Sequence, residues 1–451
     1  FWLKGRTAGN TEAPAARIKI GLSPEVESMW RHVLFLGCAV TGAFAELFEF
    51  PVCEPMTAKT LVSYYVFHIY ATAVEKTATA KASVTFQNFK VAWSNGDVGL
   101  STYQGLQVSL VPWSNFSGIV NLTYFCSLDG DVTFKNNANE VIVFNPAKAK
   151  SLTRPIQATG EYLLMVTNCG DRSGAILRSG QVIVHQPHGY LPGNKIWTFY
   201  WWGWSTLVDE ILCVIWIIAV ACHWRAIVYA QKVIAILAVV GSVHGVLAYL
   251  QYLYWNLSGI RNMILYWGTM TAYSIKYFIT LRLLVGTASG SGISVEGLAK
   301  PASFKVEVVS LVFLVMQWIW KLTVSNKYRI MIKPHVTMAV MVPGTILWLY
   351  LYIWIYRQFN SLCARLQDKS FASEVVSRYI NMRLILVLSL LLATVVFVLQ
   401  LADILWADTP WNFQWVPYDA APYSVYTLFL LAMMILWWPT KDSWKFGYTN
   451  Q

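Results

Sequence analysis

The sequence predicts an all-β domain followed by an all-α membrane domain of seven helices. Of the 451 residues, 56% are hydrophobic and 13% are charged, and this charge is about half that of an ordinary soluble protein. Long apolar runs fill the chain after Trp201, whereas short apolar runs alternate with turn residues before it. Long apolar runs are typical of membrane-spanning helices, and short interrupted runs are typical of strands.

The beginning of the sequence has the pattern of a secretory signal. A start at Met29 with the basic residue Arg31 leads into a short apolar run that ends in Ala-Phe-Ala at Ala45. This run is too short to span a bilayer comfortably, so we predict a signal peptide over 29–45 that is cleaved after Ala45. Residues 1–28 lack apolar periodicity, and we interpret them as a non-native upstream extension.

Residues 46–195 are predicted to form a β-sandwich in the lumen of the secretory pathway. Short β-like runs recur between turn residues, at 83–86, 141–144, 161–166 and 181–184. Runs of this length and spacing are typical of a sandwich. No strand period is clean enough to assign the sheets.

Three sequons are candidate glycosylation sites. Asn115 and Asn121 lie in the predicted luminal domain, and Asn256 falls in a predicted luminal loop close to the membrane. A chain that enters the endoplasmic reticulum presents such sequons to the glycosylation machinery.

Three cysteines remain in the luminal domain after removal of the signal, namely Cys53, Cys126 and Cys169. An oxidising lumen favours one disulfide among them with a third thiol left over, and the sequence does not decide which pair forms. The chain lacks the Cys-x-x-Cys spacing of a zinc site, so we predict no bound metal.

Residues 196–440 are predicted to cross the membrane seven times. Seven apolar stretches approach the twenty-odd residues that span a hydrocarbon core, at about 205–222, 233–255, 263–285, 306–324, 336–356, 384–402 and 423–439. Backbone polar groups find no water in that core, so the stretches must be helices. Residues 441–451 then form a short cytosolic tail.

The distribution of basic residues predicts the orientation. With the first domain in the lumen, the cytosolic segments hold Arg225, Lys232, Lys300, Lys305, Arg357, Arg365, Lys369, Arg378, Arg383, Lys441 and Lys445. The luminal loops hold Arg261, Lys321, Lys327, Arg329 and Lys333. This excess on the cytosolic side is the one that the positive-inside rule requires. It also explains the net charge of +11 without nucleic-acid binding, because the basic residues form no single cluster.

Polar residues inside the predicted spans are the functional candidates, because each is unfavourable in hydrocarbon unless it faces the bundle interior or water. Lys276 lies in the middle of the third span, with Ser274 and Thr280 on nearly the same face. His244 and Gln251 share one face of the second span. These five residues could line a cavity with Lys276 as its cationic focus, or they could form an internal network that fixes helix packing. Both interpretations stay open.

No catalytic motif is present in the sequence. We find no nucleophile elbow, phosphate-binding loop, dinucleotide fingerprint or His-Glu-x-x-His pattern. The acidic residues are expected at helix ends, with Asp209 and Glu210 opening the first helix, Glu307 opening the fourth and Asp403 closing the sixth. We therefore predict a protein that is not an enzyme and that needs no cofactor.

Several segments between about residue 160 and the end of the chain resemble one known family when they are compared together. These segments are 160–169, Pro-His-Gly-Tyr-Leu-Pro at 187–192, 249–259, Ser274-Ile-Lys276 with Arg282, Tyr379-Ile-Asn381, and Leu-Trp-Trp-Pro at 436–439 with Ser443. They are similar to the GOST family of Golgi proteins, also called the lung seven-transmembrane receptor family, which combine a GOLD-like luminal domain with seven helices.

The resemblance implies a function in membrane trafficking. It indicates a multi-pass protein of the Golgi membrane, with endosome and plasma membrane as alternatives, that sorts or chaperones cargo. The implied partners are membrane lipid, a luminal protein cargo, and cytosolic trafficking or signalling proteins. Two other classes stay open. One is a receptor that signals through the basic segment 357–383, and the other is a cation channel or Golgi pH regulator.

Overall fold

The computed structural model describes residues 47–49, 56, 60–71, 81–93, 105–113, 141–170, 174–288, 300–326, 334–367, 373–406, 410–441 and 443. The chain divides into two compact units, residues 1–187 and 188–451. The predicted upstream extension 1–28 and signal peptide 29–45 lie outside the described residues, as do Asn115, Asn121, Cys53 and Cys126. Cys169 is disulfide-bonded, but its partner is not among the described residues, so the pairing stays a prediction.

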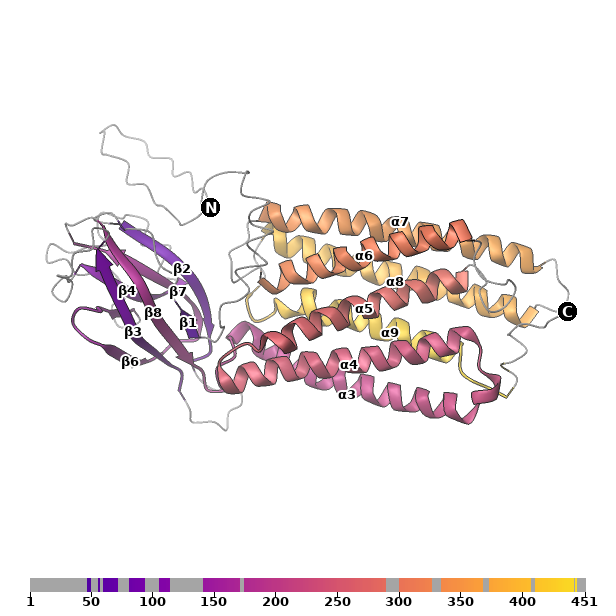
Figure 1. The fold of residues 1–451 in the computed structure, drawn as a ribbon, viewed down its shortest axis with the longest axis horizontal. Helices are drawn as coiled ribbons and strands as arrows, with labels where there is room; N and C mark the ends of the chain where they lie inside the picture. The colour runs from indigo at the N-terminus through magenta and orange to yellow at the C-terminus, as the bar shows by residue number, and fades with distance from the viewer. Residues whose placement is uncertain are drawn as a thin grey trace, which may run out of the picture. The chain divides into compact units, whose positions relative to one another are not determined.

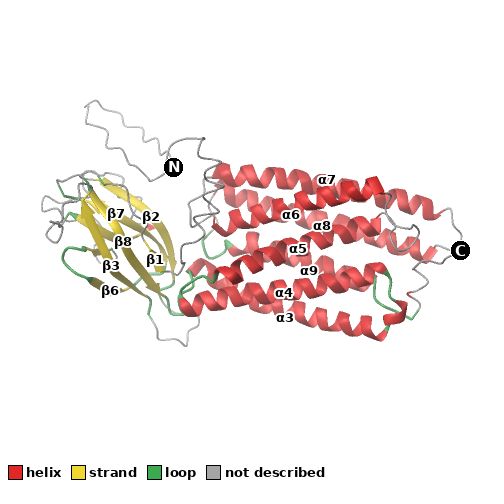
Figure 2. Ribbon diagram, viewed as in Figure 1, coloured by secondary structure: helices red, strands yellow, loops and turns green. Residues whose placement is uncertain are grey.

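Within the described residues, the first unit contains two four-stranded antiparallel sheets (Figures 1 and 2). Their strand orders are β1-β8-β3-β6 and β2-β7-β4-β5. The strands are β1 (Leu47–Glu49), β2 (Thr60–Ile69), β3 (Ser83–Trp93), β4 (Leu106–Pro112), β5 (Ile142–Phe144), β6 (Ser151–Pro155), β7 (Gly160–Asn168) and β8 (Ala175–His185). The predicted β-sandwich is confirmed. The four expected runs lie in β3, β5, β7 and β8, although β5 begins one residue later than expected.

The core of the sandwich forms where the two sheets face each other. Phe86 of β3 and Phe144 of β5 come from different sheets, and their rings stack with centroids 5.4 Å apart. Val84 and Val182 add fully buried side chains to the same cluster. Burial on alternate residues of β3 shows that one face of its sheet is in the core.

The second unit is a bundle that, within the described residues, contains seven long α-helices. These are α3 (Gly193–Cys222), α4 (Tyr229–Ser258), α5 (Met263–Ala288), α6 (Lys300–Asn326), α7 (Pro334–Gln367), α8 (Ser373–Trp406) and α9 (Ala421–Leu436). Each helix packs against the next along the chain, and the helices run alongside one another (Figure 1). Helix α9 also contacts α3 and α4, which closes the bundle.

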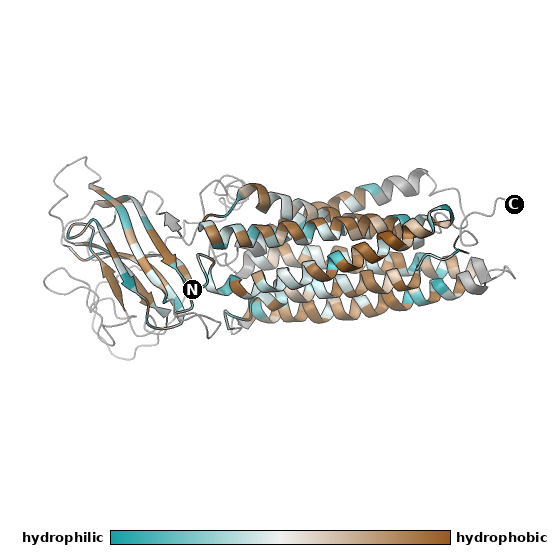
Figure 3. Ribbon diagram, turned by 90° about the horizontal axis from the view of Figure 1, so that it is seen from below, coloured by the Kyte–Doolittle hydropathy of each residue, from teal (hydrophilic) through white to brown (hydrophobic). Residues whose placement is uncertain are grey.

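The outer surface of the bundle is apolar. Leu388, Leu391, Val395 and Val398 of α8 all point away from the interior, and Leu391 is 59% exposed. Figure 3 shows hydrophobic colouring along most of the helices. In the described part of the chain, five segments are long and apolar enough to cross a bilayer, namely Gly193–Cys222, Tyr229–Ser258, Thr337–Ala364, Val376–Leu405 and Val416–Leu436.

The first helix differs from the prediction. Helix α3 begins at Gly193 rather than near residue 205, because its first turns are rich in Trp and Tyr, which have lower hydropathy than aliphatic residues and so do not register as part of a span. The expectation that Asp209 and Glu210 open this helix is therefore wrong. Both lie in its middle, and Asp209 is only 5% exposed.

Hydrogen bonds of Asn256 join the end of α4 to the segment that precedes α3. Its amide nitrogen Nδ2 donates to the carbonyl of His188 at 2.8 Å, and its Oδ1 accepts from the backbone N–H of Leu191 at 3.2 Å. The backbone N–H of Tyr190 donates to the Asn256 carbonyl at 3.0 Å. Because Nδ2 is the atom that a glycan would occupy, this arrangement favours a structural role for Asn256. Its glycosylation stays a prediction.

The hydrogen-bonded contact around Asn256 requires glycine at position 189. Its φ of +125° is unfavourable for residues with a side chain, and an added Cβ would lie 2.5 Å from Asn256 Oδ1. We expect Gly189→Ala to lower the melting temperature of the detergent-solubilised protein by several degrees, whereas Gly241→Ala in α4 should leave it unchanged or raise it slightly. An added Cβ at Gly241 meets nothing within 4 Å, and alanine is the better helix former. Equal melting temperatures for the two variants would contradict this assignment.

Candidate functional site

The bundle encloses a cavity of about 460 Å³ between α5, α6, α7, α8 and α9. This volume lies in the range of small-molecule pockets, roughly 300–1,000 Å³. Apolar and aromatic side chains make up most of the wall, including Leu284, Met316, Met341, Trp348, Leu390, Phe397, Val425 and Phe429. A ligand inside this cavity would therefore be largely hydrocarbon.

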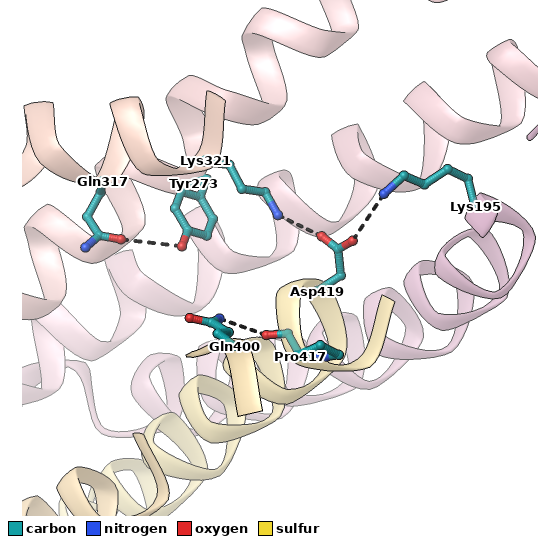
Figure 4. Close-up of polar contacts among 7 residues, drawn as sticks. All are labelled: Lys195, Tyr273, Gln317, Lys321, Gln400, Pro417 and Asp419. Atoms are coloured by element: carbon teal, nitrogen blue, oxygen red, sulfur yellow. Dashed lines mark hydrogen bonds and ion pairs between the residues drawn. The ribbon is translucent and has the colours of Figure 1, made fainter. Parts of the chain in front are cut away.

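One part of the cavity wall is polar. Lys321, Gln317, Gln400 and Tyr418 line it there. Gln317 Oε1 accepts a long 3.5 Å bond from the hydroxyl of Tyr273, and Gln400 Nε2 donates to the carbonyl of Pro417 at 2.8 Å (Figure 4). Figure 4 shows Lys321 and Gln400 reaching the short segment that precedes α9.

That segment is a π-helix, η5 (Val416–Ala420), and it places Asp419 between two lysines. Asp419 Oδ1 accepts a hydrogen bond from Lys321 Nζ at 2.7 Å, and its Oδ2 lies 3.9 Å from Lys195 Nζ (Figure 4). Asp419 is only 7% exposed. This triad lies beside the polar wall because Lys321 belongs to both. Tyr418 of the same wall donates its hydroxyl hydrogen to Asp403 Oδ2 at 2.6 Å, so a second buried carboxylate lies close to the wall.

The arrangement combines an apolar chamber with a cationic end. Hydrocarbon would contact the aromatic and aliphatic walls, and an anionic group could accept a hydrogen bond from the Lys321 ammonium group in the wall. The chemistry of the site is therefore suited to reversible binding of an amphiphile.

The five candidates from the sequence are all buried, but they are not all at the cavity. Of the five, only Thr280 lines it. Ser274 and Thr280 donate their hydroxyl hydrogens to carbonyls four residues earlier in α5, those of Met270 and Lys276. Lys276, His244 and Gln251 are buried inside the bundle and do not line the cavity.

Other charged residues of the site were not recognised as candidates in the sequence. Lys321 is predicted in a luminal loop but lies in α6, with its ammonium group buried against Asp419. Asp419 precedes the apolar run of the last span, and nothing in the local sequence indicates that it pairs with lysines about 100 and 220 residues earlier. The one local sign of a buried acidic residue is that Asp419 directly follows Val416, Pro417 and Tyr418 and precedes the apolar run of the last span.

A second group of hydrogen bonds joins the other end of α4 to a distant segment. Gln231 Nε2 donates to the carbonyl of Trp437 and to Ser443 Oγ, both at 3.1 Å. Gln231 Oε1 accepts from the backbone N–H of Val228 at 2.9 Å. One buried amide thus joins the beginning of α4 to the segment that follows α9.

These features define the class of the protein. The described part of the chain combines a bundle of long helices, an apolar outer surface and buried charges that are paired inside, so this is a multi-pass membrane protein.

The family follows from comparison with known proteins. The profile described as "GOST, seven transmembrane domain" matches residues 203–444, and the chain belongs to this family. The resemblance found in the sequence is confirmed.

Two relatives are similar to this chain over part of their length. Transmembrane protein 87A of Xenopus tropicalis is 21% identical over 298 residues, which are 64% of this chain and 53% of the relative. Transmembrane protein 87B of Mus musculus is 20% identical over 267 residues, which are 58% of this chain and 46% of the relative. The chain thus spans about half the length of the relatives it matches.

Removal of the Asp419 charge should be more destabilising than removal of a comparable exposed charge. We expect Asp419→Asn to lower the stability of the solubilised protein by about 3 kcal/mol, because the buried ammonium group of Lys321 loses its hydrogen-bonded counter-charge and the partly exposed Lys195 loses its neighbour. The matched control is Glu307→Gln, which breaks the Arg282–Glu307 ion pair between side chains that are 40% and 45% exposed. Exposed pairs contribute about 0–1 kcal/mol. Thermal melts of both variants measure the difference, and similar losses would refute the central role of Asp419.

Proposed function

We propose that this protein is a multi-pass component of secretory-pathway membranes that assists membrane trafficking by holding a lipid-like amphiphile in the cavity of its helical bundle. The observation that carries the proposal is the chamber of about 460 Å³ with apolar walls and the Lys321 ammonium group at one side. Family membership supports the membrane setting.

The expected ligand has one hydrocarbon part and one anionic group. Rings and aliphatic side chains from five helices surround the apolar space. The hydrogen bond between Lys321 and Asp419 satisfies one of the three donors of the ammonium group. A phosphate or carboxylate of a lipid headgroup would accept hydrogen bonds from the other two donors of Lys321, which lines the cavity.

The partners and the compartment belong to the same proposal. The β-sandwich offers sheet edges at β1, β2, β5 and β6, and such edges recognise extended peptide segments, so we propose luminal protein cargo as the second partner. The resemblance supports residence in the Golgi membrane with the sandwich in the lumen and the carboxyl end in the cytosol. On this proposal the protein is not an enzyme and needs no cofactor.

The receptor and channel alternatives receive less support from the described residues. Arg383 donates to Asn360 Oδ1 at 2.9 Å, so this residue of the basic segment is engaged within the bundle. The cavity wall carries the ammonium group of Lys321, and a fixed positive charge repels permeating cations. No observation favours either alternative over trafficking.

Ligand binding can be tested with a phosphatidic acid probe that carries a diazirine on one acyl chain. We expect the probe to label cavity residues of the full chain in phosphatidylcholine nanodiscs, and Gly344→Trp to reduce labelling at least about tenfold by filling the chamber. An added Cβ at Gly344 meets only Met316 Cε at 4.0 Å, so the new ring has the cavity to enter. The matched control is Leu391→Trp on the outer face of α8. Equal labelling of both variants would reject the cavity as the binding site.

The proposed orientation can be tested through the two luminal sequons, which lie outside the described residues. We expect glycosidase treatment of the protein from cells to increase its gel mobility, and this shift to disappear in the variant Asn115→Gln with Asn121→Gln. Asn256→Gln should not remove the shift, because that amide is engaged with His188 and Leu191. A wild-type protein without the shift, together with digestion of the first domain by protease outside sealed microsomes, would reverse the orientation.

A further inference from the structure

A buried cation lies next to the cavity without forming part of its wall. Lys276 in α5 has 0% of its surface exposed and is not among the lining residues. Its Nζ has no hydrogen-bond partner within the described part of the chain. It faces four aromatic rings instead, with centroids at 4.0 Å for Tyr426, 4.3 Å for Tyr423, 5.3 Å for Tyr277 and 5.8 Å for Tyr273. Cation–π attraction alone is weaker than the desolvation penalty of a buried ammonium group.

Asp209 supplies the opposite charge. It lies in the middle of α3, and its Oδ2 accepts a hydrogen bond from the hydroxyl of Tyr423. The face of that same ring lies 4.3 Å from Lys276 Nζ. One tyrosine therefore contacts both charged groups, the carboxylate through its hydroxyl and the ammonium group through the face of its ring. Opposite charges attract over longer distances in a low-dielectric interior than in water.

The neighbouring charged groups do not replace either partner. Lys321, whose Nζ lies 5.4 Å from the Tyr273 ring centroid, is hydrogen-bonded to Asp419. His244 of α4 is fully buried, and it borders the rings of Tyr423 at 5.9 Å and Tyr273 at 5.7 Å. Asp209 is thus available to Lys276, and α3, α4, α5 and α9 meet around the two charges.

The rings around Lys276 connect it to the cavity. Tyr273, Tyr277 and Tyr426 contact the ammonium group and also line the chamber. A single layer of tyrosine side chains therefore separates the buried charge from a bound ligand. Loss of the charge on Lys276 would let these rings move, and movement of the rings would change the shape of the cavity that a ligand occupies.

We propose that Asp209 and Lys276 form one charge pair, joined by Tyr423, that holds the tyrosine wall of the cavity in place. Lys276 is then a positioning residue that controls ligand binding without touching the ligand. Loss of one partner leaves a lone charge in the interior, which draws in water or displaces the rings, whereas loss of both partners leaves a neutral interior. The inference rests on the proposed function for its ligand readout.

The test is a double-mutant cycle with Lys276→Met, Asp209→Asn and the double variant, each as the full chain in phosphatidylcholine nanodiscs. We expect each single substitution to weaken binding of the phosphatidic acid probe about tenfold. The double variant should bind within about twofold of wild type. Ser274→Ala is the matched control, because Ser274 is buried in the same helix and its hydroxyl hydrogen goes to the Met270 carbonyl.

A second readout does not depend on the ligand. The fluorine NMR signal of 3-fluorotyrosine at position 426 should shift in both single variants and return toward the wild-type position in the double variant. If wild type fails to bind the probe, the proposed function is rejected and the fluorine signal alone decides this inference. If the single variants do not fold, recovery of folding in the double variant supports the pair.

Three results would overturn the charge pair. The first is wild-type binding and an unshifted signal in the single variants. The second is a double variant whose loss of binding equals the two single losses multiplied together. The third is a double variant that fails to fold when both single variants also fail.

Discussion

Pairing of buried charges is the constraint on which the helical bundle depends. An ion inside an apolar bundle is tolerated only when an opposite charge and polar contacts compensate for the water it has lost. Asp419 meets this condition through Lys321 and Lys195, and Asp209 meets it through Tyr423, whose ring also faces the Lys276 ammonium group. Helices α3, α5, α6 and α9 are thereby joined by electrostatics as well as by packing.

Tyrosines let the same interior serve two purposes. A tyrosine ring packs as a hydrophobic surface, attracts a cation over its face, and carries a hydroxyl that can donate a hydrogen bond. Tyr423 uses all three properties between Asp209 and Lys276. Tyr273 and Tyr426 present aromatic surface to the cavity as well as to the ammonium group. The buried charge of Lys276 therefore lies next to the cavity, with only tyrosine rings between them.

The parts of the fold that depend on local pattern could be predicted from the sequence. Short strands and long apolar helices each produce their own periodicity, which is why β3 and β7 lie where they are expected and each later predicted span overlaps one helix. Helix α7 continues to Gln367 and α8 begins at Ser373, because their polar ends do not belong to the apolar runs. The start of α3 was missed because its first turns are aromatic rather than aliphatic. That error moved Asp209 from the middle of a span to its end and removed it from consideration as an interior residue.

The site was less predictable because its pairings join distant parts of the chain. Lys276 could be recognised alone, since one lysine within an apolar run is conspicuous. Its electrostatic partner Asp209 and its contact Tyr423 are separated from it by 67 and 147 residues, and no local period connects such positions. The cavity itself is a product of how α5 to α9 pack, so the sequence could suggest a polar interior but could not distinguish the residues that line it from those behind its wall.

The segments that carry the family resemblance do not all inform on function. Three of them take part in contacts at the ends of α4, since Asn256 binds the 188–191 segment and Gln231 binds Trp437 and Ser443. Backbone fastenings of this kind specify how the bundle closes, whatever it binds. Only the segment around Lys276 reaches the interior beside the cavity. Family membership therefore establishes the bundle, and the identity of the ligand has to be argued from the charges and rings that surround the chamber.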